Sequence, residues 1–370
     1  METIRNAHDG EMHNILDCIN VSFSYDRHEP FDISDSQPKV YKNTKDFSNI
    51  HNVYEKDNEI CCVVGNLKNN FEVDNKLYPF SVIGSVSTLP EFRNKGYMTK
   101  TLQTVIDENK NTGVVFSVLT GLRRRYNNFG FEKCGFRYYF SFDQSFCKYQ
   151  KQNNITIAKF ENKYLNKIFD IYASSNHYIK RNKQDFILTL QTSYSQVFVI
   201  LADSCVIGYF TYSSKKQRIN EFKINNLSYL EETIAAIIKA LDTTRITFVV
   251  NPLEKDYVIA LDKICEEKLA TEQLHFLVYD MVRFLEMLIA INKKVKNIKP
   301  QIRVVCIDGE NICIEITQDN YQVYLTNKKA LEKYTFTQKQ FLRQCLGLIS
   351  MYDDDDLFPL LLDINYTDLF

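Results

Sequence analysis

Two stretches in the first third of the chain have the apolar pattern of buried strands. Residues 59–66, EICCVVGN, and 80–88, FSVIGSVST, carry mostly apolar and β-branched side chains. The polar pair Asp74-Asn75 lies between them and is typical of a tight turn. The pattern therefore predicts two strands flanking this turn.

After the second strand the pattern changes to helical spacing. The positions that recur with the period of about 3.6 residues are Met98, Leu102, Val105, Ile106 and Asn109. Gly113 is a typical helix stop. A buried strand is predicted at 114–121, then a short polar turn or helix, and then aromatic strands at 126–142 around a tight turn at Gly130. Residues 1–145 are therefore predicted to form a mixed α/β unit.

From about residue 146 a similar order of elements begins again. The segments YLNKIFDIYASS and YLEETIAAIIKALD are predicted helices, QVFVILADSCVIGYFTYS is a hairpin that turns near Asp203-Ser204, and ITFVV is a strand. No Arg-x-x-Gly loop precedes the second helix. The similarity indicates either a repeat that kept the fold and lost a site, or a chance likeness between short α/β runs.

The last section has a different pattern. It begins with a predicted helix at 281–291, MVRFLEMLIAI, followed by the polar linker NKKVKNIKPQ. Alternating strands are predicted in IRVVCIDGENICIEIT and NYQVYLT, and a helical stretch in TQKQFLRQCLGLIS. We therefore predict three units, at 1–145, 146–279 and 280–370.

Composition and charge narrow the class of protein. A chain of 370 residues exceeds one ordinary core, and its 45% hydrophobic and 25% charged residues are typical of a globular protein. The net charge of −1 argues against a nucleic-acid partner. The ten cysteines include no CxxC pair, which predicts reduced thiols and a cytoplasmic location. No apolar run approaches the roughly 18–20 residues of a membrane span, so a soluble protein with no membrane partner is expected.

One loop combines glycine and charge at the start of a predicted helix. It reads Arg93-Asn94-Lys95-Gly96. The first N–H groups of a helix have no backbone partner and the helix dipole adds positive potential, so such a loop can hold a phosphate. The spacing is neither the GxGxxG of dinucleotide folds nor a Walker loop. Taken alone, a glycine tolerated beside solvated charges is the simpler interpretation.

The stretch SVSTLPEFRNKGYM, residues 85–98, resembles the acetyl-CoA pyrophosphate loop of the GNAT acetyltransferase superfamily. The resemblance implies that acetyl-CoA is the co-substrate, with a strand backbone on its pantetheine amides and the loop N–H groups on its pyrophosphate. Met98 departs from the family pattern, since many members have a smaller residue there. The coenzyme-binding residues that the resemblance implies are Val86, Ser87, Thr88, Arg93, Asn94, Lys95, Gly96, Tyr97, Met98, Thr99, Gly121 and Leu122.

Further features resemble the Eis-like (enhanced intracellular survival) branch of this superfamily. YNNFGF at 126–131 is similar to its Tyr-x-x-Phe-Gly-Phe/Tyr signature. The second unit is similar to its degenerate central GNAT domain, and the third to its sterol-carrier-protein-like domain. The resemblance implies an α+β or α/β chain of tandem GNAT folds, each a mixed sheet with flanking helices, before a sterol-carrier-protein-like C-terminal domain. It also implies a homo-oligomer, commonly a hexamer.

Acetyl transfer to an amine needs a proton for the leaving thiolate and a base for the amine. The resemblance assigns the role of general acid to Tyr126, whose phenol can donate a proton. The alternative is that Tyr126 only packs in the core, as most of the 23 tyrosines will. It assigns the base to the C-terminal carboxylate of Phe370. Chain ends are normally frayed and inert, but the stretch LFPLLLDINYTDLF is apolar enough to favour burial.

Two charged runs in the sequence are not assigned a catalytic role. Arg123, Arg124 and Arg125 either reach coenzyme phosphates or form a solvated helix face, and we favour the solvated face. The run DDDD at 353–356 either steers cationic substrates or is a solvated acidic loop, which we again favour. The chain has no HExxH motif and no G-x-S-x-G elbow, so neither a metal site nor a serine triad is predicted.

The sequence thus predicts an acetyl-CoA-dependent N-acetyltransferase that transfers the acetyl group directly to a primary amine. Aminoglycosides, lysine ε-amines of proteins or peptides, and polyamines all fit as acceptors. Two other classes remain. One is a module that binds coenzyme A, an acyl-CoA or an apolar ligand without turnover. The other is a structural or regulatory protein that uses the fold as an interaction surface and has no affinity for coenzyme A.

Overall fold

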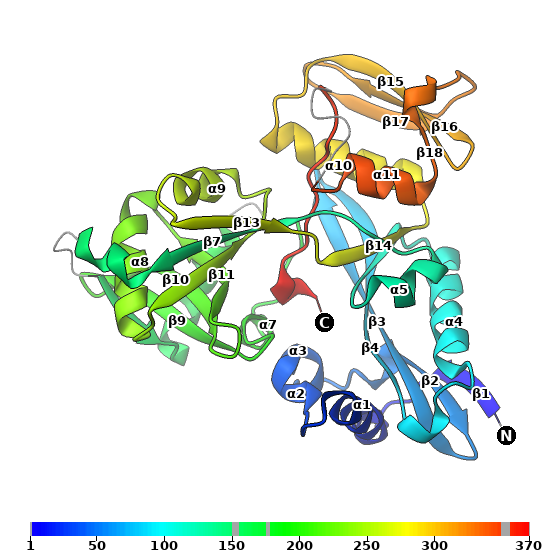
Figure 1. Cartoon of the computed structure of the whole chain (residues 1–370), viewed down its shortest axis with the longest axis horizontal. Coiled ribbons are helices and arrows are strands. Elements are labelled where there is room, and N and C mark those ends of the chain that lie inside the picture. Colours follow the sequence, from blue (N-terminus) through cyan, green and yellow to red (C-terminus); the bar gives the residue numbers. More distant parts are fainter. Residues whose placement is uncertain (1, 150–154, 175–177, 349–355, 370) are drawn as a thin grey trace.

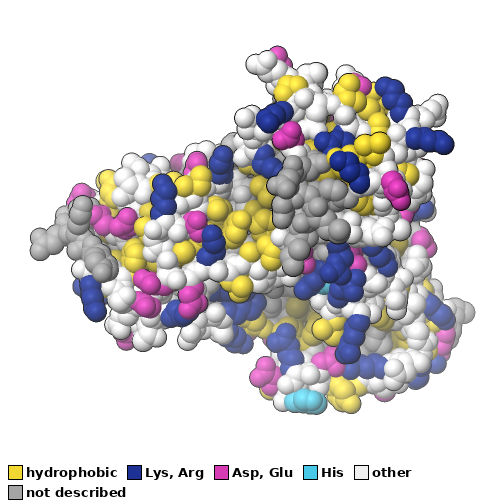
Figure 2. Space-filling model, turned by 45° about the horizontal axis from the view of Figure 1, so that its top comes forward, with side chains coloured by type: hydrophobic (Ala, Val, Ile, Leu, Met, Phe, Trp, Pro, Cys, Tyr) yellow, Lys and Arg dark blue, Asp and Glu magenta, His cyan; other side chains and the backbone are white. Residues whose placement is uncertain are grey.

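The computed structural model describes residues 2–149, 155–174, 178–348 and 356–369, and the strands in these ranges form three β-sheets. Figure 1 shows the sheets in three lobes, blue to cyan, green and orange, with the red C-terminal stretch ending between them. Basic and acidic side chains are interspersed over the face that Figure 2 presents, in keeping with the net charge of −1. Among the described residues, no helix is long and apolar enough to cross a membrane.

The first sheet has seven strands in the order β1-β2-β3-β4-β5-β14-β6. They are β1 (Glu2–Asn6), β2 (His51–Lys56), β3 (Glu59–Val73), β4 (Lys76–Thr88), β5 (Phe116–Thr120), β14 (Leu274–Val278) and β6 (Glu132–Lys133). The two predicted strands and their turn are confirmed, because β3 and β4 form an antiparallel hairpin. Asp74 and Asn75 turn it with φ angles of 52° and 60°, a conformation that Asp and Asn tolerate.

Helices cover both faces of this sheet. They are α1 (Met12–Arg27), α2 (Ile33–Ser36), α3 (Pro38–Tyr41), α4 (Tyr97–Asn111) and α5 (Arg123–Tyr126). The helix predicted from spacing is α4, whose Leu102, Val105 and Ile106 are buried against β3, β4 and β5. Gly113 follows it with a φ of 75°, which confirms the predicted stop.

The prediction of aromatic strands at 126–142 is only partly right. Residues 126–129 form the end of α5 and a 3₁₀ turn, and strand structure begins at Glu132. Gly130 has a φ of 94°, and its N–H donates to the carbonyl of Asn127. A glycine in this left-handed conformation closes a helical turn, so the aromatic side chains before it lie on a helix.

The second sheet has seven strands in the order β13-β7-β12-β11-β10-β9-β8. Its elements are β7 (Arg137–Asp143), β8 (Ile155–Lys159), α6 (Leu165–Ala173), α7 (Phe186–Leu190), β9 (Ser195–Ala202), β10 (Cys205–Ser213), β11 (Arg218–Ile224), α8 (Leu230–Ala240), β12 (Arg245–Val250), α9 (Lys255–Asp262) and β13 (Glu267–Thr271). The predicted hairpin is confirmed, with Asp203 and Ser204 in its turn. The parallel pair β11 and β12, joined through α8, has the same order as β4, α4 and β5.

The third sheet has four strands in the order β17-β16-β15-β18. Its lobe consists of α10 (Met281–Val295), β15 (Gln301–Ile307), β16 (Glu310–Ile316), β17 (Tyr321–Leu325), β18 (Thr335–Phe336) and α11 (Gln338–Cys345). The helix predicted at 281–291 is confirmed, but it continues to Val295 and takes in the start of the predicted linker. Asn292 explains the difference, because it is buried and donates to the carbonyls of Leu288 and Leu361.

The first two sheets exchange strands. β7 directly follows β6 along the chain, yet it pairs with β12 and β13 in the second sheet. β14 comes from the end of the second lobe and lies between β5 and β6, antiparallel to both. Phe276 at its centre is fully buried, with its ring 5.8 Å from that of Phe116 in β5. Each sheet therefore contains a strand from across the boundary at 145 predicted from the sequence.

The described C-terminal stretch, residues 356–369, runs from the third lobe to the junction of all three (Figure 1). Two buried arginines hold it there. Nε of Arg137 lies 2.8 Å from a carboxylate oxygen of Asp363, and Nε of Arg181 lies 2.6 Å from one of Asp368. All four side chains are nearly inaccessible to solvent. Ion pairs as well as apolar residues thus fix the stretch at 356–369.

Candidate active site

β4 and β5 lie side by side for only part of their length. Their parallel pairing ends with Ile83 opposite Leu119, although β4 continues to Thr88. Ser85 and Val86 there oppose a single residue of β3, which makes a β-bulge, and Ser85 has a φ of 51°. The strands therefore separate, and hollows open along β4 on either side of Ser85.

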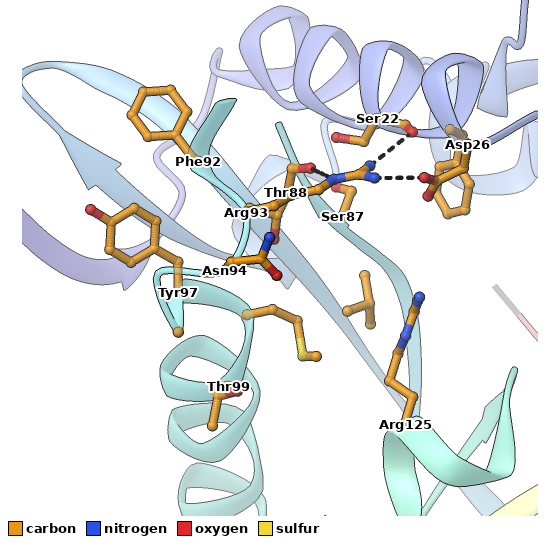
Figure 3. Close-up of a pocket in the computed structure, with 14 residues that line it drawn as sticks. Ser22, Asp26, Ser87, Thr88, Phe92, Arg93, Asn94, Tyr97, Thr99 and Arg125 are labelled. Atoms are coloured by element: carbon orange, nitrogen blue, oxygen red, sulfur yellow. Dashed lines mark hydrogen bonds and ion pairs between the residues drawn. The ribbon is translucent and has the colours of Figure 1, made fainter. Parts of the chain in front are cut away.

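The larger hollow is a cleft of about 330 Å³ between the end of β4, the loop before α4 and helix α1 (Figure 3). It brings together most of the residues that the sequence predicts to bind the coenzyme. These are Val86, Ser87, Thr88, Arg93, Asn94, Gly96, Tyr97, Met98 and Thr99. Lys95, Gly121 and Leu122 are not among its lining residues. Phe92, Arg125 and three residues of α1 (Ser22, Phe23 and Asp26) also line it, and no motif in the sequence pointed to those of α1.

The loop before α4 leaves the first N–H groups of that helix without a capping side chain. Gly96 is the N-cap residue and has a φ of 80°. Nothing lies within 4 Å of the position that a Cβ would take there, so the φ angle requires the glycine rather than any lack of space. Asn94 also has a positive φ, of 62°. Uncapped N–H groups at a helix start attract an anion.

Arg93 is turned toward α1. Its guanidinium donates to Asp26 at 2.6 Å, to the carbonyl of Ser22 at 3.2 Å and to the carbonyl of Thr88 at 3.1 Å (Figure 3). Lys95 donates to a backbone carbonyl of the preceding turn at 2.9 Å. These bonds fix the loop against α1. Part of the positive charge in the loop is therefore already engaged within the protein.

The three arginines at 123–125 have different surroundings. Arg123 makes two bonds of 2.6 Å to the carboxylate of Glu132, which is buried. Arg124 is exposed. Arg125 lines the cleft and extends from α5 toward the end of β4 (Figure 3). All three arginines are exposed, as the favoured interpretation of a solvated face expects. Arg125 in addition lines the cleft, where it could meet an anion.

Tyr126 is 5% exposed and is not among the lining residues of the cleft. It belongs to an apolar cluster against which the lining residues Val86 and Met98 pack. Its ring packs against Phe131 and His275, with centroids 6.3 and 6.5 Å away. Burial raises the pKa of its hydroxyl, and the neighbouring Arg125 opposes that rise. A Cβ on Gly121, which has a φ of 146°, would lie 2.6 Å from Cε2 of Tyr126. Gly121 therefore admits the Tyr126 ring.

The smaller hollow, about 50 Å³, lies where β4 and β5 separate. Neutral polar and apolar residues from five parts of the chain line it: Ser36, Gln37, Val82, Ile83, Gly84, Leu119, Thr120, Thr192, Ser193 and Leu369. Nothing in the sequence pointed to residues 36–37 or 192–193. Phe370, predicted to carry the catalytic carboxylate, lies outside the described residues, but Leu369 directly before it is buried in this hollow.

A chain of buried hydrogen bonds reaches the bulge from β2. The Tyr41 hydroxyl lies 2.9 Å from Nε2 of His51 and 2.5 Å from Oγ of Ser85. Nδ1 of His51 lies 3.1 Å from the carbonyl oxygen of Phe47 and 3.2 Å from that of Ser48. Burial lowers the pKa of His51 to about 4. The sequence assigned no role to these side chains.

Across the part of the chain that the structure describes, no group of three or more His, Cys, Asp or Glu side chains could hold a metal ion. In the acidic run at 353–356, residues 353–355 lie outside the described residues. Asp356 is exposed and lies 3.7 Å from Lys299. This placement agrees with a solvated position for that one carboxylate.

Comparison with known proteins identifies the first lobe. Residues 3–134 match the family model described as an acetyltransferase (GNAT) domain. The match includes the bulge, the loop before α4 and Tyr126. A comparison with curated proteins finds no match. The first lobe therefore has the fold of a GNAT acetyltransferase domain.

Solved structures with a similar fold extend over nearly the whole chain. A protein from Enterococcus faecalis V583, described as a probable N-acyltransferase of unknown function, is 14% identical, with a TM-score of 0.68 over 98% of this chain and 97% of that one. A GCN5-related N-acetyltransferase from Anabaena variabilis ATCC 29413 is 13% identical, with a TM-score of 0.69 over 99% and 98%. Eis1 from Mycobacterium abscessus is 10% identical, with a TM-score of 0.63 over 93% and 90%. At these identities the likeness concerns the fold, and it includes all three lobes.

Proposed function

We propose that this protein is an acetyl-CoA-dependent N-acetyltransferase that acetylates a primary amine by direct transfer. The observation that carries the proposal is the opening between β4 and β5, with a hollow on each side of Ser85. Two reactants can approach each other through such an opening. Tyr126 belongs to the apolar cluster behind Val86 and Met98, which line the larger hollow. It lies within the residues that match the acetyltransferase family model.

The larger cleft suits the donor. The uncapped N–H groups of α4 near Gly96 would hold the pyrophosphate, and Arg125 adds a guanidinium from the opposite wall. Beyond Ile83, β4 no longer pairs with β5. Its backbone groups at 86–87 are thus open on that side to bind the pantetheine amides, because main-chain donors and acceptors seek partners, whereas the carbonyl of Thr88 already accepts from Arg93.

The reaction requires two proton transfers. The neutral amine attacks the thioester carbonyl carbon, so that a C–N bond forms and the C–S bond breaks without a covalent intermediate on the protein. Tyr126 gives its proton to the departing sulfur as a general acid, and Arg125 offsets the charge left on the phenolate. The terminal carboxylate of Phe370 takes the proton from the nitrogen. The burial of Leu369 in the smaller hollow supports this role.

We further propose that the chain is Eis-like, with units at 1–145, 146–279 and 280–370. The second unit would be a GNAT-like fold that cannot hold the coenzyme, since Glu231 and Glu232 occupy the first turn of α8 and would repel a phosphate. The third would be sterol-carrier-protein-like. A cytoplasmic homo-oligomer, commonly a hexamer, belongs to the same proposal.

Release of the coenzyme A thiol from acetyl-CoA tests the proposal. The panel contains several aminoglycosides, a lysine peptide and spermidine, and the protein keeps a free C-terminus. We expect turnover of at least one amine and a kcat about 10²–10⁴-fold lower in Tyr126→Phe, the range for a lost general acid. Tyr78→Phe is the matched control, because its buried hydroxyl lies at the other end of β4.

Coenzyme A binding without turnover of any panel amine would instead favour the non-catalytic binding module. A protein with no affinity for coenzyme A would favour the interaction-surface alternative.

A further inference from the structure

The buried chain of His51, Tyr41 and Ser85 has no part in the transfer described above. These side chains are 0%, 8% and 7% exposed. Polar groups buried to this degree destabilise the fold unless their hydrogen bonds are made. Their donors and acceptors can be assigned one by one.

The assignment begins at His51. Its Nδ1 faces the carbonyl oxygens of Phe47 and Ser48, and carbonyl oxygens only accept, so Nδ1 carries a hydrogen. Because burial holds the pKa of His51 at about 4, the ring is neutral near pH 7 and Nε2 is an acceptor. Tyr41 therefore donates its single hydroxyl hydrogen to Nε2.

Ser85 is the next member. The hydrogen of Tyr41 is already used, so Ser85 must be the donor in the 2.5 Å bond between them. No hydrogen is then left for Oε1 of Gln37, which lies 3.5 Å from Oγ of Ser85. The free lone pairs of Ser85 and the amide oxygen of Gln37 face each other as two acceptors. Oγ of Ser85 and Oε1 of Gln37 can therefore both accept hydrogen bonds from a ligand.

We propose that Ser85 and Gln37 bind the nitrogen of the acceptor amine, while Tyr41 and His51 keep Ser85 an acceptor. A primary amine or its ammonium form has several N–H donors and no need for a donor from the protein, so it matches two neighbouring acceptors. Gln37 lines the smaller hollow, and Ser85 lies directly beside it on β4. The inference rests on the proposed function, since it locates the acceptor of that reaction.

A second observation points to the same hollow. Oγ1 of Thr192 is buried and has no hydrogen-bond partner among the described residues, and Thr192 also lines this hollow. The other polar side chains that line it in the described chain are neutral. An unpartnered hydroxyl in such a place is satisfied when a polar ligand enters. The hollow is therefore suited to an amine recognised through neutral oxygens.

Steady-state kinetics of Ser85→Ala and Tyr41→Phe test the inference, with spermidine, a lysine peptide and kanamycin as acceptors. We expect Ser85→Ala to raise the acceptor KM about tenfold through loss of one hydrogen bond, with the acetyl-CoA KM unchanged. Tyr41→Phe should have a similar effect without touching the acceptor, because the hydrogen of Ser85 is then free to bond Oε1 of Gln37 and occupy that second acceptor. Tyr78→Phe removes the hydroxyl of a residue elsewhere on β4 that is 1% exposed, and it should leave the acceptor KM unchanged.

The double variant separates a positioning role from a merely structural one. If Tyr41 acts through Ser85, Ser85→Ala with Tyr41→Phe will have the same acceptor KM as Ser85→Ala alone. Additive losses, a raised acetyl-CoA KM in Tyr41→Phe, or an unchanged acceptor KM in Ser85→Ala would overturn the inference and leave the proposed function standing.

A wild-type protein that turns over no amine calls for calorimetry with spermidine in the presence of coenzyme A. Weaker binding by Ser85→Ala would then support the amine subsite although acetyl transfer had failed. Equal binding by the two proteins, or no binding by either, would overturn it.

Discussion

Replacing Gly121 by alanine tests whether the position of Tyr126 governs the reaction. The new Cβ would lie 2.6 Å from Cε2 of Tyr126, whereas ordinary contact begins at 3.4 Å, so the ring has to move by about 0.8 Å. Misplacement of a reacting group by about 1 Å can reduce a rate about 10²-fold. We therefore expect a kcat about 10–100-fold lower, with the acetyl-CoA KM little changed because Gly121 does not line the cleft.

Gly113→Ala is the matched control for this experiment. Gly113 also has a positive φ, of 75°, but nothing lies within 4 Å of its would-be Cβ. It should lose about 1–2 kcal/mol of stability from backbone strain and keep its kcat. Initial rates of thiol release measure kcat, and urea unfolding measures stability. A wild-type kcat in Gly121→Ala, or an equal loss of kcat in Gly113→Ala, would refute the reasoning.

Three further predictions concern the C-terminal stretch. Deleting Phe370, or extending the chain beyond it, should abolish turnover and leave thermal unfolding unchanged. One residue spans ~3.3–3.6 Å, so either change moves the carboxylate away from the ~3 Å within which a base must lie of its proton. Normal turnover would contradict the assignment. Arg181→Met should lower the free energy of unfolding by about 3–5 kcal/mol, because it leaves Glu221 and Asp368 buried without their cation; a negligible change in urea unfolding would be inconsistent with this. Burial alone would raise the pKa of Glu221, but Arg181 holds it at about 2 instead of 4.5. The stabilisation by Glu221 is therefore present above pH 4.5 and is lost as the pH falls toward 2. Glu221→Gln should unfold with less dependence on pH in this window, and identical acid unfolding curves would show the pairing to be unimportant.

Elements specified by their own residues were predictable from the sequence. The hairpin at Asp74-Asn75 and the helix α4 depend on turn residues and on a helical period, which are both local. The loop at Arg93 and Gly96 could be recognised for the same reason. The contacts of Arg93 could not be predicted from the sequence, because its partner Asp26 is 67 residues away and belongs to helix α1.

The acceptor side depends on tertiary contacts and was invisible in the sequence. Its hollow combines residues 36–37, 82–84, 119–120 and 192–193 with Leu369, and no motif links them. The acceptor character of Ser85 is a still less local property. It follows from the hydrogen on Nδ1 of His51, which faces two backbone carbonyl groups.

The insertion of β14 between β5 and β6 has a consequence for biosynthesis. β5 ends at Thr120 and its neighbour β14 begins at Leu274, so about 150 residues must be translated between them. At ~5–20 residues per second this takes roughly 8–30 s, and for that time β5 and β6 have no strand between them. Unpaired strand edges are sites of aggregation, so a nascent chain is most in need of chaperones in this interval. The first sheet is thus the first to begin synthesis on the ribosome. Its set of strands is complete only after the second lobe has been translated.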